Sequence, residues 1–198
     1  FDAIARMRSL RVVSFVGCSH LDERQLARLA ELPALEVLDL SFIGHRTFFS
    51  GQSEFGSHLE PGTGVSTFLL QQLGKAPSLR ELDIAHGEVT SEGLEALAEV
   101  KSLRSLNLAG SQVRTSDLAA LPAGLTRLRL DNCRELDNEC VAKLVNATPK
   151  LAELSLNWLS AMTDAWLEPL PGLRALDRID LSNSPRLTTA CVASLRAT

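Results

Sequence analysis

Several features that mark common functional classes are scarce or absent in this chain of 198 residues. Tyrosine is absent and only seven phenylalanines and two tryptophans occur, so aliphatic side chains must fill most of the core. No apolar run approaches the ~20 residues that span a bilayer, and we expect no membrane partner. The formal net charge of −4 and the lack of basic clusters with interleaved aromatic residues argue against nucleic acid as a partner.

Motifs that hold metals or cofactors are missing as well. The four histidines lack metal-ligand spacing, and no C-x-x-C pair occurs, so the sequence predicts no metal site. Glycine motifs that bind phosphate are also absent. We therefore expect no cofactor and no small-molecule substrate.

One short pattern recurs along the whole sequence. Residues 103–111 read L-x-x-L-x-L followed by small or polar residues, and six similar segments accompany them. The seven segments begin at Leu10, Leu35, Leu79, Leu103, Leu125, Leu151 and Leu176. Successive segments begin 22 to 26 residues apart, except for a step of 44 residues from Leu35 to Leu79. Self-similarity at this period indicates a solenoid in which each repeat packs mainly on its neighbours.

This pattern resembles that of leucine-rich-repeat proteins along nearly the whole chain. The resemblance implies an α/β fold, a right-handed solenoid or horseshoe with a parallel sheet on the concave face and helices on the convex face. Residues 17–40 and 131–156 are also similar to the cysteine-containing repeats found in the substrate-binding halves of F-box proteins. Five of the seven segments depart from that subtype, because another residue replaces the cysteine.

Each repeat is expected to form a short strand followed by a helix. Helical patterning follows the strands, as in residues 22–32, 91–100 and 137–145, and Asp22, Ser91, Ser116, Asp137 and Thr163 suit N-cap positions. Strands stack ~4.8 Å apart whereas helices pack ~8–10 Å apart, so the array must curve with the sheet inside. We expect a single domain, residues 1–198, of about seven repeats. No polar cap is visible at either end, which predicts a domain truncated at both ends.

The four cysteines occupy defined positions of the repeats. Cys18 and Cys133 are the ninth residues of their segments, and Cys140 and Cys191 lie in helical halves. A disulfide needs Cα atoms within ~7 Å, which distant repeats do not allow, so we expect free thiols that serve as small core side chains. Cys133 and Cys140 share a repeat, and a disulfide between them is the alternative. Reduced thiols favour an intracellular, cytoplasmic location.

The long step between Leu35 and Leu79 contains an insertion, residues 44–64. Five glycines, three serines and one proline without leucine periodicity predict a loop between a strand and its helix. Phe48, Phe49 and Phe55 are costly to leave in water, so this loop would fold over the solenoid or contact a partner. A tolerated surface insertion is the alternative.

Alternation along the strands predicts which residues face outward on the sheet. We assign the third, fifth, seventh and eighth residues of each segment to the concave face, about four on each of seven strands. This set approaches the ~20–30 residues that each side of an ordinary protein interface contributes. Its candidate binding residues are Asp39, Phe42, Glu81, Asp83, His86, Asn107, Arg127, Arg129, Asp131, Glu153, Asn157, Trp158, Arg178 and Asp180.

Phe42, Arg129 and Trp158 are the expected anchors of this surface, because aromatic residues and arginine dominate the energetics of interfaces. For any single charged residue, the alternative is a solvated strand face whose charges pair with one another. Ser41, His86 and Asp39 or Asp83 would lie on adjacent strands. They do not predict a hydrolase, because the sequence has no nucleophile elbow and no evident oxyanion hole.

The sequence therefore predicts a non-enzymatic module for protein–protein interaction that binds a partner protein on its concave face. Two alternatives remain open. The chain would otherwise be a static structural scaffold subunit of a large assembly, or the substrate-binding half of an F-box-type ubiquitin-ligase adaptor.

Overall fold

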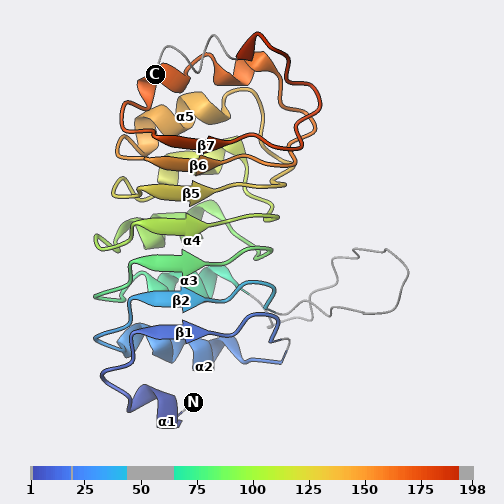
Figure 1. Ribbon diagram of the computed structural model, residues 1–198. Coiled ribbons are helices and arrows are strands. Elements are labelled where there is room, and N and C mark those ends of the chain that lie inside the picture. The colour runs from blue at the N-terminus through green and yellow to red at the C-terminus, as the bar shows by residue number, and fades with distance from the viewer. Residues whose placement is uncertain (1, 19, 44–64, 192–198) are drawn as a thin grey trace.

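The computed structural model of the protein describes residues 2–18, 20–43 and 65–191, and within them one parallel sheet runs the length of the molecule (Figure 1). Its seven strands follow one another in chain order. They are β1 (Val12–Ser14), β2 (Val37–Asp39), β3 (Glu81–Asp83), β4 (Ser105–Asn107), β5 (Arg127–Arg129), β6 (Glu153–Ser155) and β7 (Arg178–Asp180). The register aligns equivalent positions, as where Leu82 pairs with Leu106.

Helical segments form a second layer on the other face of the sheet (Figure 1). The α-helices are α1 (Asp2–Ala5), α2 (Glu23–Ala27), α3 (Thr67–Leu73), α4 (Ser91–Ala98) and α5 (Cys140–Ala147). The 3₁₀ helices are η1 (Arg28–Glu31), η2 (Thr115–Ala120), η3 (Asp164–Leu167) and η4 (Leu170–Gly172). The predicted leucine-rich-repeat solenoid is confirmed.

The leucines of the repeated pattern form the core between the two layers. In β4 and its flanks, Leu103, Leu106 and Leu108 are each at most 1% exposed, and the equivalent leucines of the neighbouring repeats are just as buried. At the last strand Ile179 and Leu181 are only partly buried. The difference follows from the solenoid geometry, because a repeat buries its leucines against a neighbour on each side.

The second half of a repeat is less uniformly α-helical than its sequence predicts. The repeat that begins at Leu103 has only 22 residues and contains η2 in place of an α-helix. A 3₁₀ helix suits this short repeat because it rises further per residue than an α-helix and so covers the same distance with fewer residues. After η3, Pro169 and Pro171 lack the N–H that an α-helix would need to continue.

Two of the expected N-caps, Asp22 and Thr163, are confirmed. The carboxylate of Asp22 accepts the backbone N–H groups of Arg24 and Gln25. The other three expectations are wrong by one or two residues. The N-cap residues are Thr90, Arg114 and Glu139 where Ser91, Ser116 and Asp137 were expected.

All four cysteines are free thiols, so the alternative of a disulfide between Cys133 and Cys140 is wrong. Cys133 donates a hydrogen bond to the carbonyl of Leu108 in the preceding repeat, at 3.2 Å. Burial raises the pKa of the Cys133 thiol to about 11 and that of Cys140 to about 12, and both thiols are therefore protonated at neutral pH.

The predicted loop, with Phe48, Phe49 and Phe55, lies outside the described residues. Across the residues that are described, no helix has both the length and the apolar character needed to span a bilayer.

We predict that Leu106→Ala lowers the free energy of unfolding by about 2–5 kcal/mol, because it leaves a cavity between three repeats. Urea denaturation followed by circular dichroism measures this loss. The neighbouring half-exposed residue supplies the control, and Ser105→Ala should change the same quantity by no more than about 0.5 kcal/mol. Equal effects of the two substitutions would contradict the assignment of Leu106 to the core.

Candidate functional site

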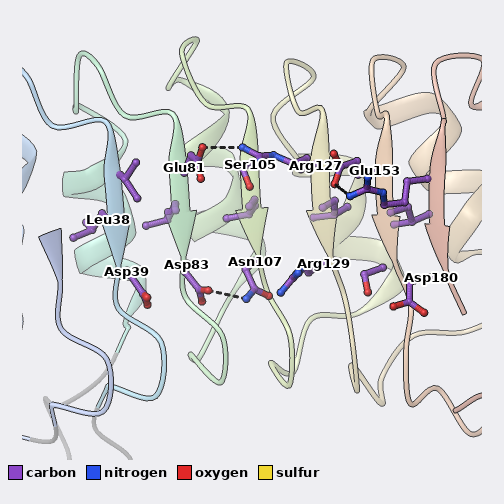
Figure 2. Close-up of a pocket in the computed structure, with 17 residues that line it drawn as sticks. Leu38, Asp39, Glu81, Asp83, Ser105, Asn107, Arg127, Arg129, Glu153 and Asp180 are labelled. Carbon is purple, nitrogen blue, oxygen red and sulfur yellow. Dashed lines mark hydrogen bonds and ion pairs between the residues drawn. The ribbon is translucent and has the colours of Figure 1, made fainter. Parts of the chain in front are cut away.

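The open face of the sheet carries two rows of side chains. In each strand the central residue points into the core, and the first and last residues point to the other face. The first row consists of the residues that begin the strands, Val12, Val37, Glu81, Ser105, Arg127, Glu153 and Arg178. The second row consists of those that end them, Ser14, Asp39, Asp83, Asn107, Arg129, Ser155 and Asp180. From β2 to β7 the rows line a groove of about 420 Å³ (Figure 2).

Nine of the predicted binding residues line this groove. They are Asp39, Glu81, Asp83, Asn107, Arg127, Arg129, Glu153, Arg178 and Asp180. The structure brings them together as alternation along the strands predicts.

Most charges of the first row are paired within the protein. Arg127 reaches across β4 to Glu81, with 2.7 Å between the nitrogen and the carboxylate oxygen, and Arg178 lies 3.5 Å from Glu153 (Figure 2). These are the mutual ion pairs that the sequence left as the alternative. Such exposed pairs contribute only ~0–1 kcal/mol each, so a partner can replace them at small cost.

The acidic and amide side chains of the second row hold the turns that follow their strands. The Oδ1 atom of Asp39 accepts the backbone N–H of Ser41 at 3.0 Å and its hydroxyl at 2.7 Å. Asp83, Asn107 and Asp180 accept the N–H two residues ahead in the same way. This bond is the Asx turn, so the frequent Asp and Asn at this position have a structural reason.

Lateral hydrogen bonds orient several of these side chains further. The Asn107 amide donates to Asp83 at 2.8 Å, and the Asn157 amide donates to Asp180 at 3.0 Å. The Ser182 hydroxyl and the Asn157 amide lower the pKa of Asp180, so this carboxylate is ionised at neutral pH.

Arg129 differs from the rest of the second row. It is exposed on β5, and within the described part of the chain no hydrogen bond or ion pair is assigned to its guanidinium. Its positive charge acts only at longer range, where it helps to lower the pKa of Asp180 after the hydrogen bonds named above. Arg129 is therefore a free arginine within the groove.

The eighth residue of every repeat has a left-handed backbone, with φ between 55° and 68°. These seven positions form what we call the turn ridge, Gly17, Phe42, His86, Gly110, Asn132, Trp158 and Asn183. Glycine and asparagine adopt this conformation readily, whereas a bulky residue does so at a cost of roughly 1–2 kcal/mol. Phe42 and Trp158 are therefore strained positions.

Beyond the fifth residue of each segment, the predicted alternation does not hold. Each strand ends there, so alternation no longer applies, and the seventh and eighth residues lie in a turn. The residues concerned are Phe42, His86, Asp131, Asn157 and Trp158. Of these, Asp131 and Asn157 still join the second row through hydrogen bonds to Ser155 and Asp180. Ser41, also assigned to the face, is 6% exposed and donates its hydroxyl to Asp39.

Aromatic side chains gather at two places along the turn ridge. The rings of Phe42 and His86 stack with 4.2 Å between their centroids. The imidazole also covers Gly110, where an added Cβ would lie 2.4 Å from the ring, so a side chain at this position would have to displace the imidazole. Further along, Trp158 is 63% exposed, and its backbone N–H donates to the carbonyl of Ser182.

Nothing in the described chain resembles a metal centre, since no group of three or more histidine, cysteine or acidic side chains converges. The site is a surface of fixed polar side chains bordered by aromatic rings.

Comparisons with known proteins agree with the fold. A family model described as a leucine-rich repeat matches residues 75–98. The crystal structure of internalin C2 from Listeria monocytogenes superimposes with a TM-score of 0.61 and 19% sequence identity, over 98% of this chain and 70% of that one. The search of curated proteins gives no match. Leucine-rich-repeat domains are generally protein-interaction modules and typically non-catalytic.

We predict that Asp39→Ala lowers the free energy of unfolding by about 1 kcal/mol, because the Ser41 N–H loses its acceptor. The matched variant Asp39→Asn keeps an Oδ1 acceptor, as Asn107 does on β4, and should unfold at the same urea concentration as the parent. Equal destabilisation by both variants would show that the charge of Asp39, and not the Asx turn, stabilises the strand end.

We also predict that Trp158→Asn leaves the free energy of unfolding unchanged or raises it by up to about 1 kcal/mol, because asparagine tolerates the left-handed backbone. Asn132 and Asn183 occupy this position in the neighbouring repeats. Thermal and urea denaturation test the prediction. A clear loss of stability would mean that the Trp158 ring packs as a structural element.

Proposed function

We propose that this protein recognises a segment of a partner protein in the groove of its sheet face. The observation that carries the proposal is the groove itself, about 420 Å³ lined by nine charged or amide side chains on six consecutive strands. Leucine-rich-repeat domains generally bind proteins, and the sheet face is the extended surface that the solenoid offers.

The groove side chains are held in place before a partner arrives. Asx turns fix Asp39, Asp83, Asn107 and Asp180, and lateral bonds tie the strand ends together. Side chains that are already ordered lose little conformational entropy when they bind a partner. Less of the favourable free energy of their contacts is therefore offset by this entropic cost. Arg129 is exposed beside them, and within the described residues no hydrogen bond or ion pair is assigned to its guanidinium.

Two other roles are the alternatives. A static scaffold subunit would use the helices of the convex side for its contacts. The substrate-binding half of an F-box-type adaptor is favoured by Cys18 and Cys133, which stand where the cysteine-containing repeats have their cysteine. The free thiols also support our proposal of an intracellular, cytoplasmic location.

Site-specific cross-linking separates the groove from the convex side. A photoreactive amino acid is placed at Ser105 in the groove or at Glu95, an exposed residue of α4. The full chain is then irradiated in an extract of the cells that make it. We expect a discrete cross-linked protein from position 105, which mass spectrometry identifies. Products from position 95 alone would contradict the groove and favour the scaffold.

The partner identified in this way allows a quantitative test. We expect Arg129→Glu to weaken its binding about tenfold or more in calorimetric titration, since it replaces the free positive charge of the groove by a negative one. Circular dichroism should be unchanged. The control is Glu95→Gln, which should leave the affinity as it is.

A further inference from the structure

The charges of the sheet face and its turns do not balance. Six carboxylates, those of Asp39, Glu81, Asp83, Asp131, Glu153 and Asp180, accompany the three arginines Arg127, Arg129 and Arg178. The two ion pairs of the first row consume both glutamates and two arginines. Among these nine residues, four aspartates and Arg129 remain outside the ion pairs, so this set carries a net negative charge.

The excess negative charge is concentrated at two places. Asp39 and Asp83 are direct neighbours in the register of β2 and β3, and within the described residues neither has an ion-pair partner. Like charges opposite each other on neighbouring strands are destabilising. The second place is Asp180 on β7, with Asp131 in the turn after β5, whose carboxylate accepts the Ser155 hydroxyl and the Asn157 N–H.

The second negative place has an exposed aromatic residue in the turns around it. Trp158 belongs to the same hydrogen-bonded turns as Asp180, since its N–H donates to Ser182, whose own N–H donates to Asp180. A carboxylate and an exposed aromatic ring in one set of turns suit an ammonium or guanidinium group, which can form an ion pair with the first and a cation–π contact with the second.

We propose that the groove binds an extended segment with two basic side chains and one acidic side chain between them. This inference rests on the proposed function and adds the chemistry of the partner. One basic group lies at Asp39 and Asp83, the other at Asp180 in the turns that include Trp158, and the acidic side chain meets Arg129. The charge complementarity of these three places selects this occupant, and it explains why a tryptophan stands at a strained position that asparagine fills in the next repeat.

The strand spacing determines the spacing of the ligand's side chains. Neighbouring strands lie ~4.8 Å apart, so the midpoint between Asp39 and Asp83 lies about four and a half strand spacings, or ~22 Å, from Asp180 on β7. An extended chain rises ~3.3 Å per residue, which puts the basic side chains about six to seven residues apart, and i+6 keeps them on one face. Arg129 on β5 lies about two and a half spacings, or ~12 Å, from the same midpoint, which corresponds to about four residues after the first basic side chain. Residues i, i+4 and i+6 of an extended chain share one face, so all three side chains can point into the groove.

Synthetic peptides test this arrangement directly. In a glycine–serine background, one peptide carries Arg, Glu and Arg at i, i+4 and i+6, and a second carries them at i, i+2 and i+6 for the opposite chain direction. The controls are a charge-inverted peptide and a scrambled peptide of identical composition. Binding to the full chain is measured by calorimetry and by tryptophan fluorescence, in which Trp158 is the exposed reporter and Trp166 is buried.

We expect one of the two designed peptides to bind about tenfold more tightly than either control. Asp39→Asn, Arg129→Ser and Trp158→Asn should each weaken that peptide about three- to tenfold. Each variant residue occurs at the same repeat position elsewhere in the chain, in Asn107, Ser155 and Asn183, so the fold is preserved. The control Glu95→Gln should leave the affinity unchanged.

Equal binding of designed and scrambled peptides, or equal losses in the variants and in Glu95→Gln, would overturn the inference. So would concentration-dependent self-association of the chain that Asp39→Asn abolishes, because the occupant would then be a second copy. A cross-linked partner at position 105 whose contact segment lacks this charge pattern would overturn the inference while the proposed function stands. Products from position 95 alone would instead reject the proposed function.

Discussion

The molecule depends on one constraint, the in-register alignment of equivalent residues in successive repeats. Backbone hydrogen bonds hold the strands at a fixed spacing, and Leu82, Leu106 and Leu128 thereby pack on one another along the core. A leucine in this arrangement is buried by its neighbours more than by its own repeat. The same register lines up the outward residues, so the binding surface follows from the burial of the core.

Alignment also brings side chains together that would otherwise repel. An Asx turn follows several strands. Asp39 and Asp83 form this turn on adjacent strands, and their two negative charges therefore lie next to each other. Asn107 forms the same turn without a charge and donates to Asp83. The residue type that forms the turn in each repeat therefore also determines the charge of the sheet face, and this charge is the basis for recognition of a partner.

Much of the fold was predictable because leucine periodicity is a local signal that recurs seven times. The strands were predictable for the same reason, and so were the nine groove residues, which alternate with buried leucines. The helical halves were predicted less well. Their ends depend on how many residues must cover a fixed distance, as in η2, and on prolines such as Pro169.

The positions of Phe42 and Trp158 were missed because alternation was extended past the end of the strand. The sequence could have predicted the turn at the eighth residue of each segment. Glycine or asparagine, which favour a left-handed backbone, stands at this position in Gly17, Gly110, Asn132 and Asn183.

The sequence by itself determined the solenoid, its period and the identity of the outward strand residues, because each depends on spacing along a single repeat. Only the tertiary structure decided how these residues divide their roles. Arg127 pairs with Glu81 across an intervening strand, Asn107 donates to Asp83 on the neighbouring strand, and no such contact is assigned to Arg129 within the described residues. Such roles depend on contacts between residues more than twenty positions apart, and the geometry that selects among them exists only once the repeats are stacked.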